Sequence, residues 1–343
     1  MIHCLTHISG IMLLLAFCLG LSGCGGDGSR RVTLFERACY PYAVFYGGKY
    51  YYTMQSPDCD EIRLWVTDDL HKLGSARSVV VWKPTDTRVS QHIWSPELHR
   101  IDGKWYIYFE ADDGNTDNHQ LYVIESGRAD PTEPAYRLHG PIITNREWNF
   151  GLHPTTLVVR GRQYLAWSGW QHRRSETEVQ CIFIARMRNP WTLDSPRVMV
   201  SRPEYEWERQ WINFDGSSAA YPIYVNENPE LMLSADGRSV IIYYSASGCW
   251  TIYTALGMLT APVGSDLTNS RSWSKSREPV FAGVPEDSVY SPSDICIVRG
   301  PGDSAPQLLY EAKRIDRGQV VKEVRLKSVS FDAKGFPVFG RPL

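Results

Sequence analysis

The stretch that decides the fold is "IDGKWYIYFEADDG" at residues 101–114. An apolar strand leads into a turn built on Asp and Gly, and a Tyr-rich strand returns, which is the pattern of a β-hairpin. Four other segments repeat this order of apolar strand, Gly-containing turn and aromatic return strand. The five hairpins begin at Pro41, Pro96, Pro154, Pro229 and Pro292. Each is followed by further strand-like segments, such as "IRLWVT" at 62–67 and "QLYVIES" at 120–126.

The repetition predicts an all-β protein, a five-bladed β-propeller with four antiparallel strands per blade, over residues 34–343. One hairpin plus two outer strands in each repeat is the pattern of a propeller blade. An irregular β-sandwich would not place a proline at the entry to every hairpin. The innermost strands of a propeller begin around a central funnel, so the residues beside the five prolines are expected to converge there. In blade order they are Tyr40, Glu97, His153, Glu227 and Asp294.

The N-terminus carries an export signal. "GIMLLLAFCLGLSGCGG" at 10–26 is a short apolar run that ends in small residues, as secretory signals do. Within it, "LSGC" at 21–24 resembles a bacterial lipobox, in which the cysteine is lipidated. We therefore predict a signal peptide at 1–23, a lipid on Cys24, a flexible tether at 24–33, and a lipid-anchored protein of the bacterial cell envelope. The segment "MIHCLTHIS" lacks Lys and Arg, so an ordinary cleaved signal with an incidental cysteine is the alternative.

The net charge and the apolar runs of the sequence limit the kinds of partner that we expect. The formal charge is −2, and no second apolar run is long enough to span a bilayer. We expect no nucleic-acid partner, contact with a membrane only through the lipid, and a monomer. Five cysteines remain beyond the anchor, an odd number that leaves at least one thiol free. Cys39 and Cys59 flank one predicted hairpin and could form a disulfide; buried free thiols are the alternative.

Several motifs resemble family 43 glycoside hydrolases, the five-bladed propellers that act on arabinofuranosides and xylosides. They are "WSPELHRIDGKWYIYFEADDG", "NPWTLDSPRVMVSRPEYEWE", "VNENPELML", "YYSASGCWTIYTALGMLTAP" and "SWSKSREPVF", and the resemblance covers residues 38–342. It implies inverting hydrolysis by three funnel carboxylates: an Asp base in the first blade, an Asp that adjusts pKa in the third, and a Glu acid in the fourth. In such a reaction one carboxyl protonates the leaving oxygen while the other activates water from the opposite face of the sugar.

The resemblance places the acid on Glu227 in "NENP". Tyr40 stands where the base is expected, and His153 stands where the third carboxylate is expected. Asp294 and Glu311 replace two fifth-blade histidines. Glu97 agrees with the family as a carboxylate near the substrate.

The roles of the replaced residues stay open at this point. His153 is a candidate base near neutral pH. A phenol titrates near 10, so Tyr40 either fills the space of the lost Asp and stacks on sugar, or acts as a nucleophile whose proton passes to Asp294 or Glu311. Those two carboxylates could instead bond to basic residues such as Arg314. Indole rings suit the apolar faces of sugars, which makes Trp94, Trp148, Trp170 and Trp250 candidates for substrate binding. Glu97 and Arg314 are further candidates for substrate binding in the funnel.

The sequence therefore predicts a glycosidase acting on oligo- or polysaccharide that contains arabinose, xylose or related sugars, with Glu227 as acid and an altered base. The alternative is a carbohydrate-binding pseudoenzyme of the same fold. No cofactor is required, and the resemblance implies at most a central Ca²⁺ ion or water in the funnel. We predict no metal site in the acidic loop at 110–119, because it lacks the spacing of a metal-binding loop.

Overall fold

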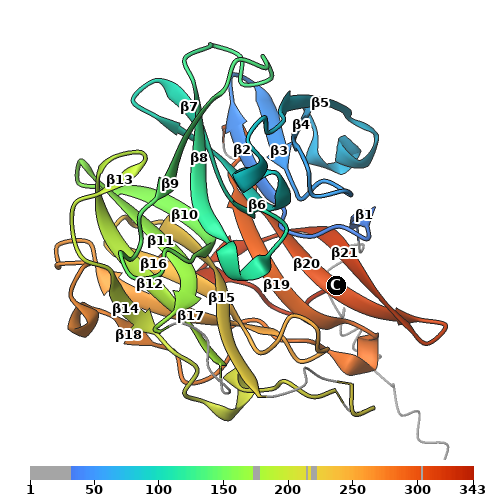
Figure 1. Ribbon diagram of the computed structural model, residues 1–343. Coiled ribbons are helices and arrows are strands. Elements are labelled where there is room, and N and C mark those ends of the chain that lie inside the picture. Colours follow the sequence, from blue (N-terminus) through green and yellow to red (C-terminus); the bar gives the residue numbers. More distant parts are fainter. Residues whose placement is uncertain (1–31, 173–177, 214, 218–221, 303) are drawn as a thin grey trace, which may run out of the picture.

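The computed structural model describes residues 32–172, 178–213, 215–217, 222–302 and 304–343. Its sheets are arranged around a central axis as the five blades of a propeller (Figure 1), and the predicted fold class is confirmed. Within the described ranges, helical structure is limited to short 3-10 turns. No helix among these residues is long and apolar enough to cross a membrane. The predicted signal peptide, the lipobox and Cys24 lie outside the described residues.

Each blade is built from strands that follow one another in the chain, from the funnel outward. Blade I contains β2 (Tyr42–Tyr46), β3 (Lys49–Thr53), β4 (Ile62–Thr67) and β5 (Arg77–Trp82), with η1 (Leu70–Ser75) before its last strand. Blade II contains β6 (Gln91–Ile101), β7 (Lys104–Asp112), β8 (Gln120–Ser126) and β9 (Arg137–Ile142), with η2 (Thr87–Val89) and η3 (Thr116–Asn118) in its connections.

Blade III contains β10 (Leu152–Val159), β11 (Arg162–Trp170), β12 (Glu178–Asn189) and β14 (Val198–Ser201), with the short β13 (Thr192–Leu193) and η4 (Glu206–Glu208). Blade IV contains β15 (Ile223–Leu233), β16 (Ser239–Ala246), β17 (Ala255–Pro262) and β18 (Ser274–Lys275), with η5 (Ser270–Ser272). A short parallel pairing of β12 with β15 joins these two blades into one continuous sheet.

Blade V closes the ring. It contains β19 (Tyr290–Val298), β20 (Gln307–Asp316) and β21 (Gln319–Ser328), preceded by η6 (Pro285–Asp287), and its outermost strand is the N-terminal β1 (Val32–Glu36). The tether was expected to reach residue 33, but β1 already begins at Val32, because pairing with β21 satisfies its backbone groups. A final pair, β22 (Ser330–Phe331) and β23 (Pro337–Val338), follows the last blade.

Ion pairs hold β1 in place. Glu323 on β21 is 1% exposed and accepts hydrogen bonds from Arg325 Nε at 2.9 Å and from Arg314 Nε. Arg314 Nη2 also lies 2.9 Å from Glu36 Oε1 on β1. Arg314 lies on β20, and its guanidinium extends outward to neutralise carboxylates of β21 and β1. It therefore points away from the funnel, where it was expected to bind substrate.

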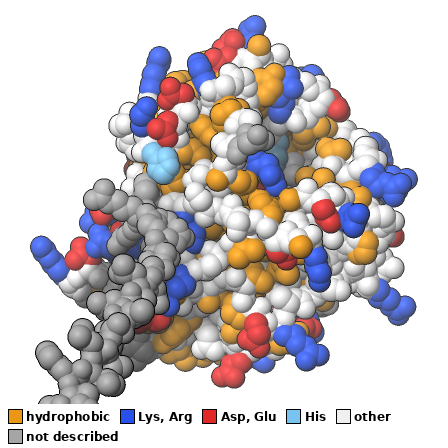
Figure 2. Space-filling view, turned by 180° about the vertical axis from the view of Figure 1, so that it is seen from behind, with side chains coloured by type: hydrophobic (Ala, Val, Ile, Leu, Met, Phe, Trp, Pro, Cys, Tyr) orange, Lys and Arg blue, Asp and Glu red, His pale blue; other side chains and the backbone are white. Residues whose placement is uncertain are grey.

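The core consists of five apolar clusters among the described residues, one in each interface between adjacent blades. Successive residues of a strand face opposite sides of the sheet, so each inner strand supplies apolar side chains to both neighbouring blades. Tyr51 packs toward blade II, for example, and Tyr52 packs toward blade V. This explains why the return strands of the hairpins are aromatic throughout. On the outer surface, side chains of both charges are scattered among apolar ones (Figure 2).

The five cysteines in the described ranges, Cys39, Cys59, Cys181, Cys249 and Cys296, are free thiols. Cys39 and Cys59, which could have formed a disulfide, lie on either side of the Gln55 side chain. Gln55 Nε2 lies 3.0 Å from Cys59 Sγ, and its Oε1 lies 3.9 Å from Cys39 Sγ. The amide thus occupies the space that a disulfide would need.

Candidate active site

The funnel is surrounded by five residues with left-handed backbone, one per blade. Four lie on the innermost strand of their blade, and Tyr40 lies two residues before β2. The five residues are Tyr40 (φ 58°), Ser95 (46°), His153 (52°), Asn228 (48°) and Asp294 (47°). This conformation costs about 1–2 kcal/mol for a residue with a side chain. In four blades the next residue is proline, and in blade V it is Ile295. We call these five residues the funnel ring.

The observed ring differs from the predicted alignment of the blades at three positions. Glu97 was expected in the ring but lies two residues beyond Ser95, deeper in the channel. Glu227 lies one residue before Asn228, toward the mouth. Pro292 is three residues before Ile295, the true counterpart of the other four prolines. The sequence signal that identifies the ring is the residue before proline, and blade V lacks it.

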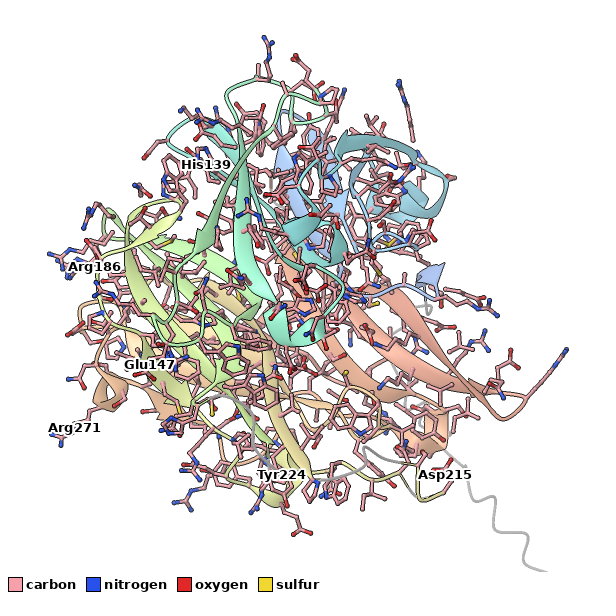
Figure 3. All side chains as sticks on the ribbon, in the orientation of Figure 1. His139, Glu147, Arg186, Asp215, Tyr224 and Arg271 are labelled. Carbon is pink, nitrogen blue, oxygen red and sulfur yellow. The ribbon has the colours of Figure 1, made fainter. Side chains whose placement is uncertain are left out.

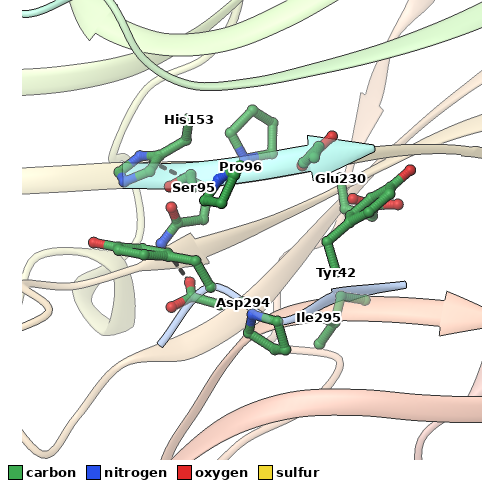
Figure 4. Close-up of a pocket in the computed structure, with 12 residues that line it drawn as sticks. Tyr42, Ser95, Pro96, His153, Glu230, Asp294 and Ile295 are labelled. Atoms are coloured by element: carbon green, nitrogen blue, oxygen red, sulfur yellow. Dashed lines mark hydrogen bonds between the residues drawn. The ribbon is translucent and has the colours of Figure 1, made fainter. Parts of the chain in front are cut away.

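A small cavity lies at the ring, with about 30 Å³ of space, room for about one water molecule. His153 and Asp294 approach it from opposite sides (Figure 4). Asn228 connects them, because its side-chain amide donates to Asp294 Oδ1 and its backbone N–H donates to His153 Nδ1 at 3.4 Å. The Tyr40 ring centroid is 5.3 Å from that of His153. The phenol therefore occupies funnel space beside the imidazole.

Neither Tyr40 nor His153 has the protonation behaviour of a catalytic base. Burial, followed by the neighbouring Cys39 and Cys249, raises the pKa of the Tyr40 hydroxyl well above 10. Tyr40 thus stays neutral, which favours the space-filling role over the nucleophile. Burial also lowers the pKa of His153 to about 3, assisted by the positive charges of His119 and Lys322. His153 is therefore a neutral, weakly basic imidazole, and the expectation of a base titrating near neutrality does not fit its surroundings.

Glu110 lies behind His153 and was not anticipated from the sequence. Its Oε2 accepts the backbone N–H of His153 at 3.1 Å, and its Oε1 accepts Ser95 Oγ at 3.2 Å. Burial raises the pKa of this fully enclosed carboxyl to about 7. Glu110 pairs in register with Trp94, directly before the ring residue of blade II, just as Glu311 pairs with Ser293 in blade V. The two glutamates are therefore structural counterparts.

Glu227 has the environment that a general acid needs. The residue is 6% exposed, and burial raises the pKa of its carboxyl to about 7, in spite of the opposing charges of Lys322 and Lys313. Its Oε1 has no hydrogen-bond partner among the described residues. A carboxyl that is partly protonated at neutral pH and has a free oxygen can transfer a proton to a substrate.

Carboxylates and lysines form a buried group beside Glu227. Lys322 Nζ lies 3.1 Å from Glu311 Oε1, and the negative charge of Glu311 and its neighbours outweighs burial and raises the pKa of Lys322. Asp294 accepts a hydrogen bond from Ser245 Oγ at 3.1 Å, and burial, together with Glu311, raises the pKa of its carboxyl. Glu311 thus finds its cation in Lys322, whereas the sequence suggested Arg314.

Lys313 is a second cation that sequence reasoning missed. It is 3% exposed, and its Nζ donates to Cys249 O at 2.7 Å and to Thr251 O. Side chains two residues apart on a strand share a face. Lys313 follows Glu311 by two residues on β20, so this spacing could have placed it in the funnel.

A second pair of carboxylates lies deeper in the channel. Glu97 and Glu230 each follow the proline of their blade, and both line the cavity. Burial raises the pKa of both carboxyls, and for Glu230 the charge of Glu97 adds to the effect. Glu97 Oε2 lies 2.9 Å from His99 Nε2. These groups make the deeper part of the channel polar.

Within the described ranges, no group of three or more His, Cys, Asp or Glu side chains is arranged to hold a metal ion. Asp294, at the position where the family's histidine was expected, bonds to Asn228 and Ser245.

Comparison with known proteins identifies the family. Residues 33–337 match the family model for glycosyl hydrolases family 43. The chain belongs to this family.

Two relatives are extracellular exo-alpha-(1->5)-L-arabinofuranosidases. The one from Streptomyces chartreusis is 35% identical over 269 residues, which cover 78% of this chain and 77% of that protein. The one from Streptomyces avermitilis is 34% identical over 306 residues, 86% of this chain but 60% of that longer protein. Among solved structures, an alpha-L-arabinofuranosidase from Lactobacillus brevis superposes with a TM-score of 0.79 at 29% identity, covering 90% of this chain and 96% of that chain.

The four tryptophans expected near the substrate differ in exposure. Trp170 is buried. Trp94 is half-buried and stacks on His119 at 4.6 Å between ring centroids. Trp148 is also half-buried, and its indole N–H donates to Asp117 O. Trp250 is 38% exposed. Among these four family 43 side chains, only Trp250 leaves a large apolar face in contact with solvent.

Proposed function

We propose that this family 43 protein hydrolyses glycosidic bonds of arabinofuranosyl-containing glycans, with Glu227 as the general acid. The observation that carries the proposal is the state of Glu227. Its carboxyl is buried in the funnel wall, has a pKa of about 7 and keeps one oxygen that no described residue bonds to. The names of the relatives support arabinofuranosyl linkages as the substrate class.

In this proposal Glu227 protonates the glycosidic oxygen as the bond to the leaving sugar breaks. The water that attacks the opposite face needs a proton acceptor, roughly 6.5–9.5 Å from the acid in inverting enzymes. Tyr40 and His153 occupy the two positions from which the family's other carboxylates were expected, and neither is basic near neutral pH. The acceptor must then come from another blade, where Glu110 and Asp294 are the carboxyls at the ring.

A second candidate function is carbohydrate binding without turnover. It is favoured by Tyr40, because the phenol stands at the expected position of the base and the remaining cavity holds only about one water molecule. In that case the funnel mouth would bind glycan while the reaction centre stays blocked.

We propose in addition that lipidation of Cys24 anchors the protein in the bacterial cell envelope. The lipobox-like "LSGC" supports this placement. The word extracellular in the names of both Streptomyces relatives is consistent with export.

The test measures hydrolysis and binding on the same variants. Wild type, Glu227→Gln and Tyr40→Asp are assayed with 4-nitrophenyl arabinofuranoside, the matching xyloside and arabino-oligosaccharides. Glu227→Gln should reduce kcat by about 100-fold or more and leave the Kd within a few-fold, because the amide keeps the shape but has no transferable proton. The exposed Glu206→Gln is the matched control and should leave both unchanged.

Tyr40→Asp separates the two candidate functions. Aspartate tolerates the left-handed backbone of this position and restores the family's expected base. Hydrolysis that appears only in Tyr40→Asp identifies the wild type as a binding protein. An active wild type that loses turnover in Glu227→Gln supports the hydrolase. An active wild type that is indifferent to Glu227→Gln refutes the assignment of the acid.

A further inference from the structure

The loop between β16 and β17, residues 247–254, lies beside the acid. Ser245, two residues before the loop, pairs in register with Glu227. The loop therefore leaves blade IV at the funnel mouth, on the side where the proposed acid meets the departing sugar. Two of its aromatic side chains remain open to solvent, since Trp250 and Tyr253 are each 38% exposed.

Internal hydrogen bonds fix the shape of this loop. The hydroxyls of Thr251 and Thr254 both donate to Gly248 O, at 2.9 and 3.3 Å. Lys313 holds the loop from blade V through the carbonyls of Cys249 and Thr251. Both threonines are buried. The backbone that carries the two aromatic rings is thus anchored on its inner side.

The neighbouring segment fixes the loop from the other side. Asn213 Oδ1 accepts the backbone N–H of Ile252 at 2.9 Å, and Asn213 Nδ2 donates to Trp250 O at 3.3 Å. The indole N–H of Trp250 donates to Trp211 O at 3.0 Å. In Figure 3 the labelled Asp215, which follows this segment in the chain, and Tyr224 on β15 both lie along the lower edge of the molecule.

Trp250 is consequently immobilised with its polar atom satisfied and an apolar face exposed. Its ring packs on Gly248, where an added Cβ would come within 2.4 Å of the indole. Large aromatic groups that are held rigidly at a surface bind ligands with little loss of conformational entropy. The C–H faces of sugars are apolar and stack on such aromatic rings.

We propose that Trp250 and Tyr253 form a leaving-group subsite that binds the sugars next to the scissile bond on the side of Glu227. This inference rests on the proposed function. The loop "SGCWTIYT" at 247–254 contains no Asp, Glu, Lys or Arg, so its occupant is a neutral glycan chain. The substrate class is therefore an oligosaccharide whose leaving part has at least two neutral sugar units.

The experiment compares ligands of increasing length. Arabinose, arabinobiose, arabinotriose and arabinotetraose are titrated calorimetrically into Glu227→Gln protein, which should not consume them. The affinity should rise at least tenfold from the biose to the tetraose. Adding Trp250→Ala should abolish most of this gain, Trp250→Phe should restore part of it, and Tyr253→Ala should reduce it. Tyr46→Ala, which removes an aromatic ring that is 40% exposed at the far turn of blade I, is the matched control and should keep the gain.

Hydrolysis of the same series by wild type and Trp250→Ala provides a second readout, as the dependence of kcat/KM on chain length. A length dependence that Trp250→Ala leaves intact would overturn the subsite, as would a wild type whose affinity does not grow with length. Absence of turnover together with a Trp250-dependent gain in affinity would reject the hydrolase and retain the subsite. The two proposals can thus fail separately.

Discussion

Replacing Glu227 with glutamine should stabilise the protein, and should do so more strongly at higher pH. The pKa of this carboxyl is about 7 in the folded protein, against an ordinary value of 4.5 that applies to the unfolded chain. Between pH 4.5 and about 7, the folded protein keeps a proton that the unfolded chain releases. The free energy of unfolding therefore falls as pH rises through this window. At about 1.4 kcal/mol per pH unit, the loss is about 3 kcal/mol once the pH exceeds 7.

Glutamine has no charge at any of these pH values, so its variant does not show this fall in the free energy of unfolding. Glu227→Gln should thus raise the free energy of unfolding by about 3 kcal/mol at pH 8, but by about 1 kcal/mol or less at pH 5. Urea unfolding followed by tryptophan fluorescence at both pH values measures the difference. Glu206→Gln is the control, because water surrounds its exposed carboxylate in both states. An equal effect of Glu227→Gln at the two pH values, or a larger one at pH 5, would refute the buried and partly protonated state of Glu227.

Three further predictions concern the proposed acid, a buried ion pair and the N-terminal anchor. If Glu227 is the acid, kcat/KM should fall about tenfold per pH unit above pH 7, and a pH–rate profile that stays flat to pH 9 would exclude this role. Glu323→Gln should lower the free energy of unfolding by about 3–5 kcal/mol, because it removes the counter-charge of the buried Arg325; urea unfolding checks this, and a loss below 1 kcal/mol would contradict it. Cys24→Ser should release the protein from membranes in cell fractionation with little change in Tm, and continued membrane association would reject the lipobox.

The fold could be predicted because its signal is local and repeated. Each hairpin can be recognised by apolar strands on both sides of a Gly-containing turn, as in residues 101–114. The five repeats of this pattern predict the number of blades. The closing strand is different. β1 pairs with β21 across nearly the whole chain, and a five-residue strand next to a Gly/Ser-rich tether gives no periodic signal of where pairing begins. Val32 was therefore assigned to the tether.

The site was predictable only in part, because convergence in a funnel depends on register as well as on sequence. The prolines located the level of the ring in four blades, and this placed Tyr40 and His153 correctly. Asp294 was also expected in the ring, although Pro292 lies three residues before the true counterpart of the other prolines. The same marker misplaced Glu97 and Glu227 by one or two positions, since one residue along a strand turns a side chain to the other face. Glu110, Lys313 and Lys322 come from second and third strands, which carry no motif of their own and reach the funnel through pairing.

The energetic cost of Glu227 bears on whether the funnel still performs chemistry. This carboxyl lowers the free energy of unfolding by about 3 kcal/mol at pH 8, and one of its oxygens has no partner among the described residues, so it is a poor choice for a purely structural position. Tyr40 and His153 show that two positions of the neighbouring funnel ring hold side chains that stay uncharged near neutral pH. A funnel that only packed the blades together could hold a neutral side chain at 227 as well and would be more stable. A destabilising acid in the same funnel as these two neutral side chains is the pattern expected of a functional group. If Glu227→Gln gains stability at pH 8 and loses turnover, Glu227 is both destabilising and catalytic. The wild type could instead show no hydrolysis, while Glu227→Gln gains stability and keeps its affinity for glycan. That result would assign Glu227 to a site that has lost its catalytic activity.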